Sequence, residues 1–199
     1  MFEVPDKLYP GENFNMMLSV FVGVSVDGFI ARRDGALDFL PADCEPHGYE
    51  EFIATIDALV IGRNTFETVL GFPEWPYGDK RVVVLSSRPL DFSAVTGGNV
   101  EQMAGSPQEI VAKLAARGVQ HVYVDGGITI QGFLRAGLVD RLIITRVPVL
   151  IGDGIPLFGS LPRDVQLKHV ATHTYPSGLV KSEYRVLSAD QSQAAQAGD

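Results

Sequence analysis

Five short apolar segments rich in β-branched residues alternate with stretches of helical pattern, and this order constrains the fold more than any other feature. The five segments are LSVFVGVSV (18–26), DALVIG (57–62), KRVVVLSS (80–87), HVYVDGG (121–127) and RLIITRV (141–147). They do not alternate cleanly between apolar and polar residues, which is typical of central strands covered on both faces. The sequence therefore predicts an α/β fold built on a mostly parallel sheet.

Three helices are expected between these strands. Residues 49–57 place apolar side chains on one face. Residues 106–109 (Ser-Pro-Gln-Glu) form a capping box with proline at the first helical position, and Gly118 provides a left-handed cap at the end of that helix. A third helix is predicted over residues 128–136 and ends at Gly137 in the same way.

Beyond residue 140 the pattern changes to strands without helices. A strand, a Pro/Gly-rich loop and a hairpin turning at residues 176–178 predict an antiparallel edge to the sheet. We expect one domain over residues 17–187. Residues 1–16 are expected to be an N-terminal extension and residues 188–199 a flexible tail.

Charge and composition exclude several classes of function. The chain has 199 residues, with 16 Lys and Arg against 24 Asp and Glu and a net charge of −8, which disfavours a nucleic-acid partner. No apolar run approaches the roughly 20 residues of a membrane span, and the N-terminus lacks the order of a signal peptide. The lone Cys44 cannot form an internal disulfide. We therefore expect a cytoplasmic protein with a small-molecule substrate.

Several common functional motifs are missing. The sequence contains no G-x-G-x-x-G after its first strand, no P-loop and no G-x-S-x-G elbow. His169 and His173 have the spacing of a helical metal pair but fall in a predicted strand. Four residues of strand span about 13 Å, too far for the two rings to share one ion. We expect no metal site.

Three predicted strands end in residues that could bind an anion. The first of these strand ends is the segment from Gly62 to Glu67. A strand runs into glycine, Arg63 follows, Thr65 lies inside the helix start, and Asn64 and Glu67 have capping-box spacing. Free N–H groups at such a helix start form an anion site. The alternative is an ordinary capped helix with a surface arginine.

Two further strand ends have similar chemistry. Ser86, Ser87 and Arg88 end an apolar strand and could clasp a phosphate, the alternative being a polar turn before proline. Gly126 and Gly127 precede a helix, where paired glycines let a ligand approach the backbone; a tight turn would need one glycine only. Sites in open α/β sheets lie beyond the carboxyl ends of strands, so the three ends together indicate one elongated, phosphate-bearing ligand.

The chain carries five motifs whose sequence and order resemble those of the dihydrofolate reductase superfamily. The resemblance is strongest to the branch that contains the reductase domain of riboflavin biosynthesis and its stand-alone relatives. The motifs are VSVDGFIA, DALVIGRNTFE, VVVLSSRP, VYVDGGITIQGFL and GLVDRLIITRVPVLIGDGIPLF. They extend from about Met17 to Leu187. The resemblance implies a dihydrofolate reductase-like three-layer fold, and a homodimer.

The resemblance also implies NADPH as cofactor and assigns its contacts. The residues are Gly23 and Ile30 for the nicotinamide; Gly62, Arg63 and Thr65 for the pyrophosphate and adenosine phosphate; Ser86, Ser87 and Arg88 for the 2′-phosphate and adenine; and Gly126, Gly127, Ile128, Ile130 and Gln131 for the pyrophosphate.

On the substrate side the resemblance leaves two candidate catalytic acids, Asp43 and Asp38. A buried carboxylate there would have a raised pKa and would support protonation of the reduced bond. Asp27, Phe39 and Thr145 are the candidate substrate contacts, although Asp27 and Phe39 also fit structural roles.

These expectations combine into a hydride-transferring reductase acting on a pteridine- or pyrimidine-bearing substrate, as in the reduction of 5-amino-6-(5-phosphoribosylamino)uracil. The partner deaminase motif H-x-E…P-C-x-x-C is absent from this chain. Two alternatives stay open: a dihydrofolate reductase proper, and a non-catalytic NADPH- or nucleotide-binding protein of the same fold.

Overall fold

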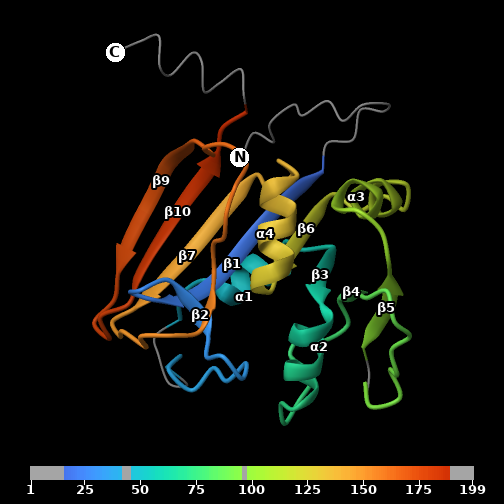
Figure 1. The fold of residues 1–199 in the computed structure, drawn as a ribbon, viewed down its shortest axis with the longest axis horizontal. Helices are drawn as coiled ribbons and strands as arrows, with labels where there is room; N and C mark the ends of the chain where they lie inside the picture. The colour runs from blue at the N-terminus through green and yellow to red at the C-terminus, as the bar shows by residue number, and fades with distance from the viewer. Residues whose placement is uncertain (1–15, 42–45, 96–97, 189–199) are drawn as a thin grey trace.

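A mixed eight-stranded sheet with helices on both faces forms the centre of the computed structural model, which describes residues 16–41, 46–95 and 98–188 (Figure 1). No helix in these ranges is long and apolar enough to cross a membrane. The elements are β1 Met17–Ser25, β2 Phe29–Ala31, α1 Tyr49–Ala54, β3 Ala58–Gly62, α2 Arg63–Leu70, β4 Arg81–Leu85, β5 Asn99–Met103, α3 Pro107–Ala115, β6 His121–Asp125, α4 Gly127–Arg135, β7 Arg141–Val147, β8 Ile155–Pro156, β9 Leu167–Thr174 and β10 Val180–Val186.

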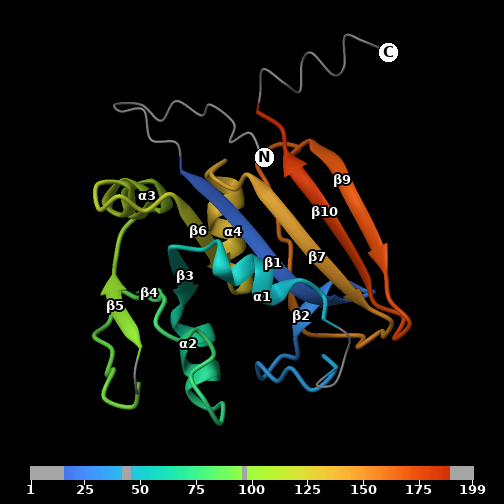
Figure 2. The same cartoon turned by 180° about the vertical axis from the view of Figure 1, so that it is seen from behind.

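The strand order in the large sheet is β5-β4-β3-β6-β1-β7-β10-β9. The first six of these strands are parallel to one another, and β10 pairs antiparallel with both β7 and β9. Figure 2 shows the β9–β10 hairpin along one edge of the sheet. The predicted α/β class, mostly parallel sheet and C-terminal antiparallel hairpin are confirmed. A separate pair, β2 and β8, lies beside the sheet.

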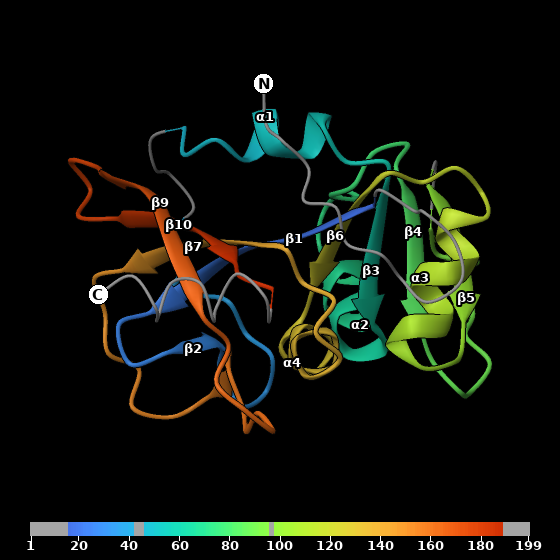
Figure 3. The ribbon, with the colours of Figure 1, turned by 90° about the horizontal axis from the view of Figure 1, so that it is seen from above.

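Each face of the sheet has its own apolar core. On one face Phe52 of α1 and Phe66 of α2 pack with Leu59 of β3. On the other, Ile110 of α3 and Ile130 of α4 belong to the second core. Figure 3 shows α1 and α4 on opposite sides of the sheet. Burial on both faces explains why the central strands are apolar throughout.

One local expectation was wrong, and one strand was not predicted. Asn64 does not cap a helix, because α2 already begins at Arg63, with Gly62 in the capping position and no side-chain cap. Glu67 instead lies 3.7 Å from the Arg63 guanidinium as an i,i+4 ion pair. Strand β5 was missed, since its sequence NVEQM is largely polar and only Met103 is buried.

The predicted capping box of α3 is present. The Ser106 hydroxyl accepts a hydrogen bond from the Glu109 N–H, and the Glu109 carboxylate accepts one from the Ser106 N–H at 2.7 Å. Gly118 and Gly137 follow α3 and α4 with φ of 77° and 68°, as expected of left-handed residues after a helix.

Replacing the cap tests this local assignment. We expect Ser106→Ala to lower the free energy of unfolding by about 1 kcal/mol, because one N–H at the start of α3 loses its acceptor. Urea unfolding measures the change. Ser160→Ala, on the exposed loop after β8, is the matched control and should leave the midpoint unchanged. Equal midpoints for both variants would contradict the role of the cap.

His121 is a buried polar group at the start of β6. Its Nε2 lies 2.8 Å from the Ser19 hydroxyl and its Nδ1 3.1 Å from the Thr55 carbonyl oxygen. Burial is the main cause that lowers the pKa of His121 to about 4. The folded protein therefore holds a neutral ring at a pH where the unfolded chain is already protonated.

This arrangement makes stability depend on pH. The unfolded chain binds the extra proton between about pH 6.5 and pH 4, so His121 should reduce the free energy of unfolding as the pH falls through that window. Relative to wild type, His121→Gln should gain on the order of 2 kcal/mol between pH 7 and pH 4.5. Urea unfolding at both pH values measures this difference, and parallel stability changes in the two proteins would refute it.

Candidate active site

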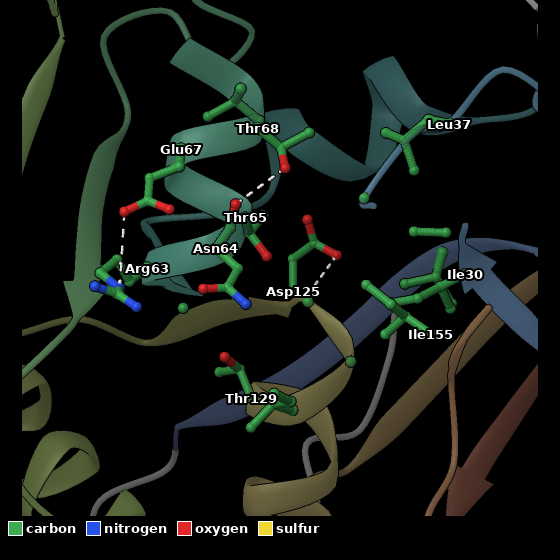
Figure 4. A pocket seen from close by; sticks show the side chains of 18 of the residues that line it. Ile30, Leu37, Arg63, Asn64, Thr65, Glu67, Thr68, Asp125, Thr129 and Ile155 are labelled. Atoms are coloured by element: carbon green, nitrogen blue, oxygen red, sulfur yellow. Dashed lines mark hydrogen bonds and ion pairs between the residues drawn. The ribbon is translucent and has the colours of Figure 1, made fainter. Parts of the chain in front are cut away.

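A cleft of about 1140 Å³ opens at the carboxyl ends of the central strands. Its floor comes from β1, β3, β4 and β6, and its sides come from α2, the start of α4 and the segment after β2 (Figure 4). Parallel strands bring these ends together although they are far apart in sequence. The cleft therefore lies where ligands bind in open α/β sheets.

Two helix starts face each other at one end of the cleft. Neither α2 nor α4 has a side-chain cap, so their first N–H groups are available to a ligand. Gly126 has φ of 90°, and a Cβ at this position would overlap the Thr65 hydroxyl oxygen. A Cβ at Gly62 would lie 2.8 Å from the hydroxyl oxygen of Thr129. Glycine at both turns lets the two helix starts form one anion-binding end.

Arg63, Asn64 and Thr65 lie at the first turn of α2, and all three line the cleft. Arg63 is the cation of this end, balanced in part by Glu67. An arginine beside free helix N–H groups suits a phosphate or pyrophosphate.

The turn after β4 lies next to the cleft but does not line it. The Ser86 hydroxyl accepts a hydrogen bond from the Arg88 N–H at 3.1 Å. From β5, the Gln102 amide donates to the carbonyl oxygens of Ser86 and Arg88 at 2.8 and 2.9 Å. Leu85, which precedes the turn, does line the cleft. The side chain of Gln102 thus fixes the shape of this turn.

Directly before the start of α4, the cleft contains a partly buried carboxylate, Asp125, at the end of β6. Its Oδ1 accepts a hydrogen bond from the Gly126 N–H at 2.8 Å. Burial raises the pKa of Asp125 to about 6, although the Gly126 bond opposes this shift. A carboxyl group with such a pKa can hold and release a proton near neutral pH.

Three tyrosines that line the cleft, Tyr49, Tyr77 and Tyr123, interact with the charge of this carboxyl group. Burial, and next the charge of Asp125, raises the pKa of Tyr49 to about 12 and those of Tyr77 and Tyr123 well above the usual value. The Tyr123 hydroxyl donates to the Phe21 carbonyl oxygen at 2.7 Å. Among the described residues, the hydroxyls of Tyr49 and Tyr77 have no hydrogen-bond partner. Both side chains line the cleft as protonated phenols.

Most of the expected cofactor contacts are brought together. Those that line the cleft are Gly23, Ile30, Gly62, Arg63, Thr65, Gly126, Gly127 and Ile128. Ser86, Ser87 and Arg88 do not line it. Ile130 is on α4 and its side chain is fully buried in the core. Gln131 donates to the Pro156 carbonyl oxygen at 3.0 Å, which ties α4 to β8. The roles assigned to these residues stay predictions.

The structure does not bring either expected catalytic acid, Asp43 or Asp38, into the described lining of the cleft. Asp43 lies outside the described residues. Asp38 is exposed, does not line the cleft and accepts a hydrogen bond from Arg32, which holds the pKa of Asp38 below its usual value. Sequence reasoning did not single out Asp125, because the Asp-Gly-Gly motif was interpreted through its glycines alone. A carboxylate ending an apolar strand just before the glycine pair was the available signal.

The three expected substrate contacts do not line the cleft either. The carboxylate of Asp27 accepts hydrogen bonds from the N–H groups of Ile151 and Gly152, which fixes the loop after β7. Phe39 is partly buried. Thr145 lies beside Gly23 in the sheet, and its buried hydroxyl has no hydrogen-bond partner among the described residues.

The sequence of this chain matches a known protein family and several relatives. Residues 17–181 match the family described as the RibD C-terminal domain. YwjB of Bacillus subtilis (strain 168), described as an uncharacterized protein, is 31% identical over 160 residues, which covers 78% of this chain and 90% of YwjB. The riboflavin biosynthesis protein RibD of Corynebacterium ammoniagenes is 29% identical over 179 residues, covering 76% of this chain but 50% of RibD.

Solved structures agree with this assignment. A Shewanella sp. PV-4 protein, whose name assigns it provisionally to riboflavin biosynthesis, is 36% identical with a TM-score of 0.80, covering 87% of this chain and all of that one. Dihydrofolate reductase from Enterococcus faecalis, solved with NADP(H), has a TM-score of 0.63 at 22% identity and covers 88% of this chain and 99% of its own. That second likeness concerns the fold alone. The chain belongs to the RibD C-terminal domain family, and its fold is that of the dihydrofolate reductase superfamily.

Proposed function

We propose that this protein is an NADPH-dependent reductase that transfers a hydride to a C=N or related bond of a pyrimidine- or pteridine-bearing substrate. Membership of the RibD C-terminal domain family supports a reductase of this kind. The observation that carries the proposal is the junction of β6 and α4. There a proton-holding carboxyl group, Asp125, directly precedes an uncapped helix start built for an anion.

The residues at the anion-binding end fit this cofactor. The hydroxyls of Thr129 and Thr65 leave no room for a Cβ at positions 62 and 126, so glycine at these positions keeps the two uncapped helix starts together. The first backbone N–H groups of α2 and α4 would bind the pyrophosphate. Arg63 and Thr65 would hold the same group from α2. Ser87 and Arg88, on the turn fixed by Gln102, would hold the 2′-phosphate. When bound, NADPH supplies the hydride.

Asp125 would supply the proton that accompanies the hydride. Because its pKa is about 6, a useful fraction of the carboxyl groups is protonated near neutral pH. As hydride adds to the carbon of the C=N bond, the nitrogen would take this proton, which yields the amine and the oxidised cofactor. The hydroxyls of Tyr49 and Tyr77 would orient the ring, and the apolar walls would limit access of water.

Cofactor selectivity tests the first half of the proposal. We expect fluorescence titration to give micromolar affinity for NADPH and at least tenfold weaker affinity for NADH, because a guanidinium binds the 2′-phosphate well. Arg88→Ala should weaken NADPH binding and leave NADH unchanged, whereas Arg163→Ala on an exposed loop should affect neither. If neither nucleotide binds, the proposed function fails. If NADPH binds without any turnover, a non-catalytic nucleotide-binding protein remains.

Asp125→Asn tests the proton donor. Since the acid form is the active one, wild-type kcat/KM should fall as the pH rises through about 6. The variant should show no fall of kcat/KM around pH 6, and its rate should be about 10²-fold lower than that of wild type. Asparagine retains an acceptor for the Gly126 N–H, so a lost rate with an unchanged pH profile would argue against the acid role.

The same variant has a readout that requires no substrate. The folded pKa of Asp125 is raised, so wild-type stability should be lost as the pH rises from about 4 to 6, where the unfolded carboxyl group ionises first. Asp125→Asn should therefore be more stable than wild type at pH 7.5, by on the order of 2 kcal/mol, and equal to it at pH 4. Thermal or urea unfolding at the two pH values measures this. If the variant is less stable than wild type at pH 7.5, the ionised Asp125 carboxylate does not destabilise the folded protein.

A further inference from the structure

One wall of the cleft comes from the chain between β2 and α1 and from the first residue of α1. Leu37, Leu40 and Tyr49 line the cleft from this part of the chain. Leu40 lies over the floor, since a Cβ added to Gly23 of β1 would be 2.9 Å from a methyl group of Leu40. The ring of Tyr49 meets that of Phe21 edge-on, with centroids 5.5 Å apart, and Phe21 also lines the cleft. The position of Tyr49 therefore sets one side of the space that is open to a substrate ring.

Helix α1 is too short to hold this wall in place by itself. It has six residues, Tyr49–Ala54, and begins after Gly48, which has φ of 87° and offers no side-chain cap. Helices of this length are marginal unless tertiary contacts hold them. Phe52 is buried and provides such a contact in the middle of the helix, and its N–H donates to the Gly48 carbonyl oxygen at 3.1 Å. The start of the helix, where Tyr49 lies, depends on what holds residues 47 and 48.

Lys181 of β10 holds these two residues. Its ammonium group donates a hydrogen bond to the His47 carbonyl oxygen at 2.7 Å. The lysine is partly buried, and a charged donor makes a stronger hydrogen bond than a neutral one. A Cβ added to Gly48 would lie 3.0 Å from the lysine nitrogen, so glycine at this position gives the ammonium group its room.

The sheet register explains why the lysine reaches this turn. Gly23 of β1 is the partner of Thr145 in β7, and Thr145 is the partner of Lys181 in β10. Cross-strand partners project from the same face of a sheet. Phe21, two residues before Gly23, projects from that face too and packs against Phe52 of α1. The side chain of Lys181 therefore lies on the α1 face, in one row with the floor of the cleft.

We propose that Lys181 is a positioning residue for the substrate. Its hydrogen bond to the His47 carbonyl oxygen holds the start of α1 on the sheet, which keeps Tyr49 against Phe21 as the wall on which the substrate ring binds. This inference rests on the proposed function and assigns to it a residue that lies outside the lining of the cleft. The contact does not involve α2 or α4, whose starts would hold the cofactor.

Lys181→Met tests the local contact without any substrate. Methionine keeps most of the length and apolar surface of the side chain but cannot donate a hydrogen bond, so the start of α1 should open more often. Hydrogen exchange of the Phe52 N–H, measured by NMR, should become at least fivefold faster.

Two further variants serve as controls for this exchange measurement. Lys181→Arg keeps a cationic donor and should exchange like wild type. Lys168→Met, the same substitution at an exposed residue of β9, is the matched control and should also exchange like wild type. An equal rise in both methionine variants, or no rise in Lys181→Met, would overturn the proposal.

Steady-state kinetics separate positioning from a purely structural role. The probes are 5-amino-6-(5-phosphoribosylamino)uracil and 7,8-dihydrofolate, and the oxidation of NADPH is followed by its absorbance. A contact that positions the bound ring acts on ground state and transition state alike. In Lys181→Met, KM for the probe that wild type reduces should therefore rise at least fivefold, while kcat stays within twofold and KM for NADPH does not change. Lys181→Arg and Lys168→Met should match wild type.

The outcomes separate this proposal from the function on which it rests. If wild type reduces neither probe, the proposed function fails and this inference fails with it. If wild type reduces one of them and KM for that probe is unchanged in Lys181→Met, the reductase proposal stands and only the role of Lys181 is wrong. A lower kcat or a weaker affinity for NADPH in place of the higher KM would likewise assign Lys181 to the fold alone.

Discussion

The close contact between two strand-to-helix turns determines the geometry of the whole cleft. Strands β3 and β6 are neighbours in the sheet, with Ile61 beside Asp125, so α2 and α4 begin side by side. The contact works because Gly126 meets the Thr65 hydroxyl and Gly62 meets that of Thr129 with no space for a Cβ. A larger side chain at either turn would push the helix starts apart. The first N–H groups of the two helices and the neighbouring Asp125 carboxyl group would then lose their fixed relation.

Strand β6 carries a buried titratable group at each end, and the two act on stability in opposite directions. His121, at the amino end, is held neutral, and the protonated form is disfavoured in the folded state. At the carboxyl end Asp125 favours its protonated form. Acidification through the same range therefore removes stability at one end of the strand and restores it at the other. The first group is structural and faces Ser19 and Thr55, whereas the second opens into the cleft.

Sequence patterns predicted the framework well, because buried strands and helix caps leave strong local signals. The five apolar runs became β1, β3, β4, β6 and β7, and the Ser106 capping box formed as expected. Strand β5 could not be recognised, since an exposed edge strand needs few apolar residues and takes its order from pairing with β4. The carboxylate in the cleft was the harder case. Asp125 acquires its raised pKa from burial that the tertiary structure creates, and a local motif does not reveal this burial.

The hydrogen bonds from Gln102 to the turn after β4 connect the proposed cofactor end of the cleft to the outermost strand of the sheet. An edge strand with exposed residues, paired on one side only, belongs to the part of a fold that opens most readily. Transient separation of β5 from β4 would release the turn that carries Ser87 and Arg88. A nucleotide held by that turn would in return oppose the opening, so occupancy of the cleft should slow amide hydrogen exchange in β5, a strand that does not itself line the site.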